Sequence, residues 1–114
     1  MKAVIYCRVD GPENPFSVDA IRGQKLELLN YAEKHGIEVT SIYLDVGYSG
    51  RTLDRPGLCS AMQAVKDNKA DTILVVNRNR LFRGHFPKEL KSLPVLAIKE
   101  QNLLKERGGK GYEL

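Results

Sequence analysis

The chain opens with an apolar segment that predicts a buried β-strand. Residues 3–7 (Ala-Val-Ile-Tyr-Cys) carry no charge, and the run is too short for a helix without a polar face, so it favours a strand covered on both sides. Arg8 and Asp10 follow at once. A charged pair therefore lies where this strand leaves the sheet, which is the usual place for a site in an open α/β fold.

Three further segments have strand character. Residues 37–44 are rich in β-branched side chains, residues 72–76 form a second continuous apolar run, and residues 94–99 (Pro-Val-Leu-Ala-Ile-Lys) predict a fourth strand. Three arginines fall within residues 78–83, directly after the third of the four predicted strands. The segment 45–53 is rich in Gly and Ser and predicts a loop.

Helical periodicity separates the first two strands. Residues 11–15 contain Gly and two prolines and predict a loop, and Ser17 is the expected N-cap of a helix over residues 17–35. Gly36 is the expected stop. The apolar positions that recur at helical spacing are Val18, Ile21, Leu28 and Ala32.

Two more helices are expected. Asp54 is the predicted N-cap of the second helix of the chain, and Pro56 lies in the first turn of that helix. Residues 86–93 have room only for a short helix, because prolines bracket the segment. Beyond Glu100 a helical turn is expected, and glycines then predict a flexible tail over residues 106–114.

Strands that alternate with helices predict an α/β fold: an open, mainly parallel sheet of about four strands with helices on both faces. In the flavodoxin-like strand order 2-1-3-4, the first and third strands are neighbours and their carboxyl ends meet at one crevice. Arg8 and Asp10 would then lie close to Arg80 and Arg83. Guanidinium groups gathered in this way suit bidentate contacts with phosphate.

Composition narrows the class of protein. The chain has 114 residues and a net charge of +4, which predicts one domain over residues 1–105 and only mildly favours anionic partners. Cys7 and Cys59 have no metal-ligand or disulfide pattern and are expected to be reduced. No apolar stretch approaches the roughly 20 residues of a membrane span, and no secretory pattern opens the chain, so a cytoplasmic protein without membrane contacts, metal or cofactor is expected.

The residues carry a family resemblance. The chain, to about residue 101, resembles the N-terminal catalytic domain of the resolvase/invertase serine recombinases, and Gln24 in the first helix fits that pattern. The most specific of the motifs is the long central one. The three motifs are residues 6–9 (Tyr-Cys-Arg-Val), residues 47–58 (Gly-Tyr-Ser-Gly-Arg-Thr-Leu-Asp-Arg-Pro-Gly-Leu) and residues 80–83 (Arg-Leu-Phe-Arg).

The resemblance implies a chemistry and a set of site residues. Members of this family cut DNA by attack of a serine on a phosphodiester, keep the bond energy in a phosphoserine link, and exchange strands within a tetramer without metal or nucleotide. Arginines around the phosphate stabilise the charge of the transition state. Carried over by position, the phosphate-binding residues are Arg8, Arg55, Arg80 and Arg83, supported by Tyr6, Gln24 and Ser49.

Two positions depart from the family pattern. Asp10 stands where the family has its nucleophilic serine, and Asn79 stands where it has an acidic residue. An aspartate that attacked phosphorus would give a high-energy acyl phosphate, and its charge would repel the phosphate by about 4 kcal/mol at 4 Å in a medium of dielectric near 20. Ser17 is too far along the chain to be a good substitute. Strand cleavage is therefore expected to be impaired or absent.

A third departure is size. Only about fifteen residues follow the last predicted strand, whereas the family has a long helix there and then a separate DNA-binding domain. The chain is either a fragment or a reduced member. Three functions stay open: a recombinase acting on DNA, a non-catalytic relative that binds DNA or other recombinase subunits or forms a homodimer, and an unrelated module for a small anion. Asp10 and Asn79 favour the second over the first.

Overall fold

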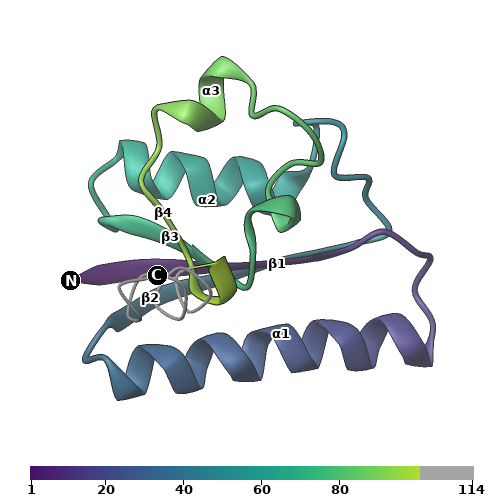
Figure 1. The fold of residues 1–114 in the computed structure, drawn as a ribbon, viewed down its shortest axis with the longest axis horizontal. Helices are drawn as coiled ribbons and strands as arrows, with labels where there is room; N and C mark the ends of the chain where they lie inside the picture. The colour runs from purple at the N-terminus through teal and green to yellow at the C-terminus, as the bar shows by residue number, and fades with distance from the viewer. Residues whose placement is uncertain (101–114) are drawn as a thin grey trace, which may run out of the picture.

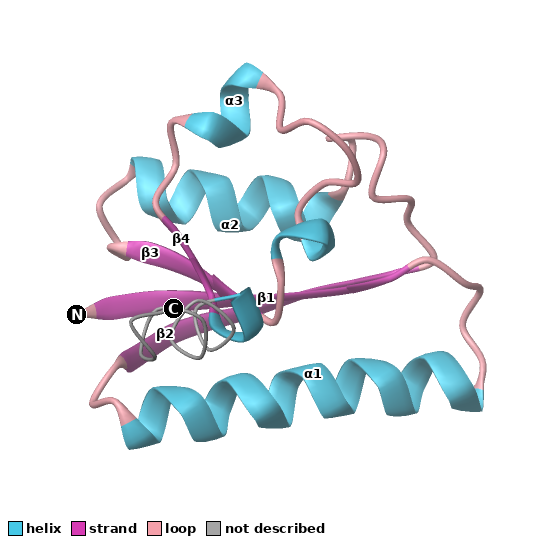
Figure 2. Ribbon diagram, viewed as in Figure 1, coloured by secondary structure: helices cyan, strands magenta, loops and turns pink. Residues whose placement is uncertain are grey.

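The computed structural model describes residues 1–100, which form a four-stranded sheet with helices on both faces (Figures 1 and 2). The strand order is β2-β1-β3-β4 and every pairing is parallel, so the predicted fold class and strand order are confirmed. The elements are β1 (Lys2–Val9), α1 (Pro15–Lys34), β2 (Glu38–Val46), α2 (Pro56–Lys66), β3 (Thr72–Val75), the 3₁₀ turn η1 (Arg78–Arg80), α3 (Lys88–Lys91) and β4 (Val95–Ala97).

The central strand β1 divides the interior into two cores. Its side chains alternate between the faces of the sheet, as the strand period requires. Ala3, Ile5 and Cys7 pack against α1, whereas Val4 and Tyr6 pack against α2 and the segment around α3. Burial raises the pKa of the Cys7 thiol to about 12, so this sulfur stays protonated at neutral pH.

On the β3 side, β1 extends beyond the end of its neighbouring strand. β1 pairs with β2 along its whole length, but its pairing with β3 covers only Ala3 to Ile5. The last residues of β1 therefore face loops on that side rather than a strand, and Figure 2 shows loops gathered where β1 and β2 end. This open edge is where the polar residues of β1 lie.

The structure corrects the predicted start of α1. The helix begins at Pro15 and its N-cap is Asn14, not Ser17. Proline is tolerated there because the first helical N–H needs no partner. Ser17 instead lies at the third helical position, where its Oγ accepts the Asn14 N–H and its own N–H donates to Asn14 Oδ1, each at 2.9 Å. The two residues form a capping box.

The structure also corrects the start of α2. Arg55, not Asp54, occupies the N-cap position, and its side chain makes no capping bond. Asp45 was expected in a loop but belongs to β2, which runs two residues further than predicted. The strand predicted over 94–99 is the three-residue β4, and the turn and tail expected after Glu100 lie outside the described residues. In residues 1–100 no helix is long and apolar enough to cross a membrane.

Candidate functional site

Arg8 is the centre of the polar cluster at the end of β1. Its side chain is fully buried, and each guanidinium nitrogen donates to a backbone carbonyl. Nε donates to Arg80 O at 2.9 Å, Nη2 to Asn79 O at 2.7 Å and Nη1 to Tyr48 O at 3.2 Å. Burial lowers the pKa of Arg8, and the nearby Asp10 carboxylate opposes that change. Arg8 thus ties β1 to the loops that follow β2 and β3.

Asp10 bridges two arginines of very different exposure. One carboxylate oxygen pairs with Nη1 of the buried Arg8. The other lies 3.1 Å from Nη2 of Arg83, whose side chain is 44% exposed. These are the ion pairs found within residues 1–100. The carboxylate therefore lies at the mouth of the cluster, between its buried part and the solvent.

Arg55 follows a predicted loop in the sequence, yet it lies in the interior of the protein. Its side chain is fully buried. Nε donates to Thr52 O at 2.8 Å, Nη1 donates to Arg80 O and to the Tyr6 hydroxyl, each at 3.0 Å, and Nη2 donates to Leu81 O. A phosphate could reach this guanidinium only after these hydrogen bonds break. In this conformation Arg55 holds η1 and the preceding loop in place.

Asp45 is the polar residue that sequence reasoning missed. It is buried at the end of β2, where its carboxylate accepts the Tyr6 hydroxyl at 2.7 Å and the backbone N–H groups of Gly57 and Leu58 at 2.9 and 3.0 Å. It thus caps α2 from another element, where a negative charge also favours the helix dipole. Burial, and then the bond to Asp45, raise the pKa of the Tyr6 hydroxyl.

Two glycines of the central motif permit these close approaches. A Cβ at Gly50 would lie 2.6 Å from Nη2 of Arg8 and 3.0 Å from Cγ of Arg83. A Cβ at Gly57 would lie 2.9 Å from both oxygens of Asp45. Only a residue without a side chain fits at these distances. The glycine spacing of the motif is therefore explained by the packing of buried charged groups.

Gln24 reaches the cluster from α1. Its Oε1 accepts the Arg8 N–H at 3.1 Å and its Nε2 donates to Arg8 O at 2.9 Å. Arg80 Nη1 also donates to Arg8 O, at 2.8 Å. Because no β3 residue pairs with Arg8, the Gln24 amide supplies the partners that a strand would otherwise give.

The remaining predicted residues surround this core. Arg80 is half-buried, and its Nε donates to Oδ1 of Asn79 at 3.0 Å. Ser49 is exposed, and its Oγ accepts the Arg51 N–H at 3.0 Å rather than a group of the cluster. The structure therefore joins eight of the nine predicted site residues in one connected cluster and leaves Ser49 at its rim. The eight are Tyr6, Arg8, Asp10, Gln24, Arg55, Asn79, Arg80 and Arg83.

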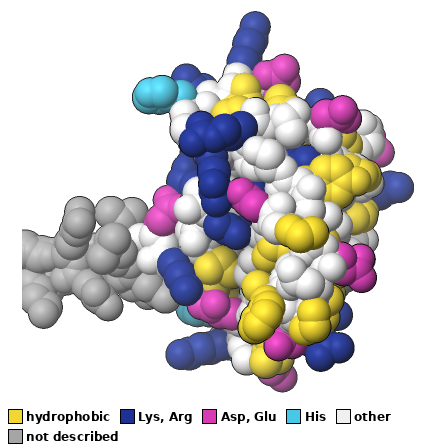
Figure 3. Space-filling model, turned by 90° about the vertical axis from the view of Figure 1, so that its right-hand side faces the viewer, with side chains coloured by type: hydrophobic (Ala, Val, Ile, Leu, Met, Phe, Trp, Pro, Cys, Tyr) yellow, Lys and Arg dark blue, Asp and Glu magenta, His cyan; other side chains and the backbone are white. Residues whose placement is uncertain are grey.

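The cluster opens onto a charged face. Figure 3 shows Lys and Arg side chains gathered on the upper left of the side where β1 and β2 end, with acidic side chains beside them. Arg51, Arg78 and Arg83 are exposed, and Arg78 stacks over the Phe86 ring at 4.2 Å. Such a face can hold an oxyanion through exposed guanidinium groups. Within the described residues no group of three or more His, Cys, Asp or Glu is placed to hold a metal ion.

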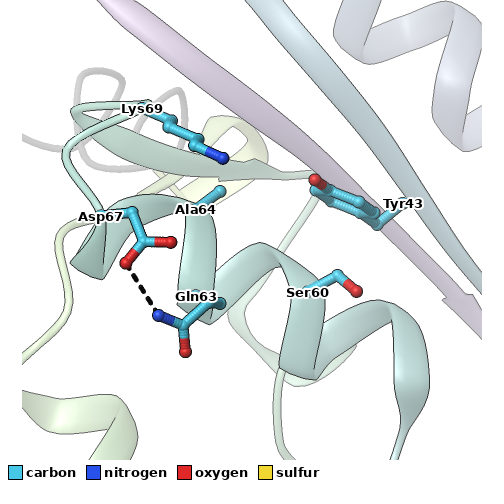
Figure 4. Close-up of a pocket in the computed structure, with 6 residues that line it drawn as sticks. All are labelled: Tyr43, Ser60, Gln63, Ala64, Asp67 and Lys69. Carbon is cyan, nitrogen blue, oxygen red and sulfur yellow. Dashed lines mark hydrogen bonds between the residues drawn. The ribbon is translucent and has the colours of Figure 1, made fainter.

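A separate cavity lies away from the arginines. Its volume is about 210 Å³, and Figure 4 shows the side chains that line it on β2, on α2 and after the end of α2. Gln63 Nε2 donates to Asp67 Oδ1 at 2.8 Å across its rim. Lys69 supplies the cavity's ammonium group. The cavity runs along α2 from Ser60 to the residues after its C-terminal end, whereas Arg55 precedes the helix.

Comparisons with known proteins identify the family. The family model described as the N-terminal domain of resolvase matches residues 3–104. The catalytic domain of ISC1926 TnpA, an IS607-like serine recombinase, is 26% identical, with a TM-score of 0.74 over 93% of this chain and 77% of that one. The N-terminal catalytic domain of TP901-1 integrase is 28% identical, with a TM-score of 0.72 over 88% of this chain and 78% of that one.

A further solved structure supports the fold alone. The first ORF of transposon ISC1904 from Sulfolobus solfataricus P2 is 19% identical, with a TM-score of 0.67 over 93% of this chain and 77% of that one. Since the family model spans nearly the whole chain, and serine recombinase catalytic domains share its sheet order and helices, the chain belongs to the resolvase family of serine recombinases, as a catalytic-type domain.

Proposed function

We propose that this chain takes part in DNA recombination as a degenerate catalytic domain that does not cut DNA. The observation that carries the proposal is Asp10, which stands where the family has its nucleophilic serine and whose two oxygens pair with Arg8 and Arg83. A carboxylate held in this way points its charge at the groups that would receive a phosphate. Its attack would also leave an acyl phosphate rather than an ester.

Asn79 supports the same proposal. Its side-chain oxygen accepts from Arg80 Nε at 3.0 Å, and a neutral amide neither takes up nor releases a proton at ordinary pH. The position can orient Arg80, but it cannot perform acid–base work on a leaving group. Asp10 in place of the serine removes the nucleophile, and Asn79 in place of the acidic residue removes a proton donor or acceptor. The arginines of the cluster are retained.

Ser17 offers no replacement nucleophile. It is buried, and the backbone carbonyls of Pro12, at 2.9 Å, and Asn14, at 3.0 Å, share its single hydroxyl proton, while Oγ accepts the Asn14 N–H. A hydroxyl committed to a helix cap is not free to attack phosphorus.

The decisive experiment is a search for a covalent protein–DNA adduct. The chain is incubated with a supercoiled plasmid library and quenched in detergent, and labelled DNA that migrates with the protein is measured. We expect no adduct and no nicked plasmid. Asp10→Ser and Asp10→Ser with Asn79→Asp test whether the scaffold regains cleavage. An adduct from the unsubstituted chain would refute the proposal, and its loss in Asp10→Asn would identify the aspartate as the nucleophile.

Association with other recombinase subunits, or with a second copy, is the alternative route to a role in recombination. Large apolar side chains are exposed on two neighbouring elements: Phe16 is 85% and Leu26 60% exposed on α1, and Leu44 is 43% exposed on β2. Figure 3 shows hydrophobic side chains gathered on the right and lower part of the face. Light scattering of the chain alone and mixed with an active relative distinguishes this route from direct DNA binding.

A further inference from the structure

The mouth of the arginine cluster holds a negative group that belongs to the chain itself. Asp10 places one oxygen against Nη1 of Arg8 and the other 3.1 Å from Nη2 of Arg83. Its own side chain is 36% exposed, so it lies at the surface between a buried cation and an exposed one. Two oxygens that bridge two guanidinium groups have the arrangement of two phosphate oxygens in the same place.

We infer that Asp10 is a resident occupant of an oxyanion site, and that a phosphate group binds there only by displacing it. The inference rests on the proposed function, since the phosphate in question is that of the DNA backbone. The proposed function explains why DNA is not cut, and this inference explains in addition why DNA binds weakly. The Asp10 carboxylate competes with phosphate for the site.

The surroundings of Asp10 favour a small oxyanion. The exposed Arg83 can turn toward a ligand without breaking a bond to buried groups, while Arg8 stays fixed by its bonds to the carbonyls of Tyr48, Asn79 and Arg80. Gly50 packs directly against Arg8, since a Cβ there would lie 2.6 Å from Nη2, and this contact also holds the guanidinium in place. A ligand that replaced the carboxylate would thus meet a fixed cation and a movable one.

Loss of the Asp10 charge should therefore lower the stability of the fold and raise its affinity for phosphate. With Asp10 neutralised, the buried Arg8 loses its only carboxylate partner among residues 1–100, which destabilises the fold. The same change gives the site one more positive charge toward a phosphate. A residue that served only the fold would change stability alone, and an ordinary solvated aspartate would change neither.

The first test measures DNA affinity by fluorescence anisotropy in the unsubstituted chain, in Asp10→Asn and in Asp54→Asn. Asp54 is exposed in the loop between β2 and α2 and its carboxylate makes no hydrogen bond or ion pair in the described structure, so it controls for the loss of one negative charge. We expect Asp10→Asn to bind about 3- to 10-fold more tightly, with a salt slope steeper by about 0.9 for one added phosphate contact. Asp54→Asn should bind less than about 2-fold more tightly, because its charge is screened.

The second test measures thermal unfolding in sodium phosphate against sodium chloride at equal ionic strength. We expect Asp10→Asn to melt about 5–10 °C lower than the unsubstituted chain in chloride, and to recover part of this loss in phosphate. The unsubstituted chain should gain less, because only the general stabilising effect of phosphate, which is excluded from protein surfaces, acts on it. If Asp10→Asn does not fold in chloride, refolding in phosphate supports the occupant, and failure to refold there overturns it.

Arg83→Ala completes a double-mutant cycle. It should remove most of the affinity gained in Asp10→Asn. Equal gains in Asp10→Asn and Asp54→Asn, or no gain in either together with no response of Asp10→Asn to inorganic phosphate, would overturn the inference. A response to inorganic phosphate without a gain in DNA affinity would support the occupant but assign the site to a small oxyanion. Covalent adducts in the cleavage assay would refute the proposed function and leave these binding results to be judged separately.

Discussion

At the scale of the residue, three arginines of the cluster, Arg8, Arg55 and Arg83, divide into two kinds. Arg8 and Arg55 are fully buried and donate mainly to backbone carbonyls, whereas Arg83 is 44% exposed and pairs with a carboxylate. In the sequence all three look alike. Burial decides which of them organise the loops and which face a ligand, because a buried guanidinium must satisfy its donors within the protein.

Paired substitutions at Arg55 and Arg83 test this division. Methionine keeps much of the side-chain length and removes the charge and the donors. Arg55→Met should lower the free energy of unfolding by about 3–5 kcal/mol, since it breaks a buried hydrogen-bond network. Arg83→Met should change it by less than about 1 kcal/mol, because its ion pair is exposed. Urea unfolding measures both, and similar losses would show that the burial of Arg55 does not matter.

At the scale of the element, the start of α2 depends on a residue eleven positions before its first helical residue. Asp45 at the end of β2 caps the helix by accepting from Gly57 and Leu58, while the local candidate Asp54 does not. Capping rules describe neighbours in sequence, and here the oxygen comes from another strand. Local pattern therefore predicted that a helix begins near Pro56 but named the wrong cap.

The alanine variants of two helical glycines test this packing. Ala is the better helix former, so Gly23→Ala in α1, where a Cβ meets nothing within 4 Å, should stabilise the fold by about 0.5–1 kcal/mol. Gly57→Ala should instead destabilise it by about 1–3 kcal/mol, the usual cost of overpacking, because its Cβ would lie 2.9 Å from the Asp45 oxygens. Thermal unfolding gives the sign of each change. A stabilised Gly57→Ala would show that Asp45 moves away at little cost.

The difference between local patterns and contacts from distant segments explains how much the sequence could predict. The strand order followed from continuous apolar runs such as residues 3–7 and 72–76, because strands buried on both faces belong at the centre of a parallel sheet. The convergence of Arg8, Asp10, Arg80 and Arg83 followed from that order. The depth of Arg55 and the role of Asp45 did not follow, since both depend on contacts between segments far apart in sequence, which periodicity does not report.

At the scale of the whole molecule, charge and apolar surface occupy different parts of one face. Figure 3 shows the main cluster of cationic side chains on the upper left of this face and most of the hydrophobic side chains on its right and lower part. The chain carries a net charge of +4, a modest excess that gives little long-range attraction. Under the proposed function, DNA binding must therefore come from the few arginines on the surface near the end of β1. No helix of the described residues forms a separate reading module for the major groove.

The last prediction is that DNA binding is weak, sensitive to salt and indifferent to sequence. Three contacts, from Arg51, Arg78 and Arg80, would give a slope of about −2.7 in log affinity against log salt, so that affinity falls about 40-fold between 50 and 200 mM salt. Arg51→Ala should reduce the slope by about one unit, whereas Lys34→Ala, at the far end of α1, should leave it unchanged. Anisotropy titrations with two unrelated duplexes measure this. Tight binding to one duplex that salt does not weaken would contradict the prediction, because phosphate contacts alone cannot distinguish sequences.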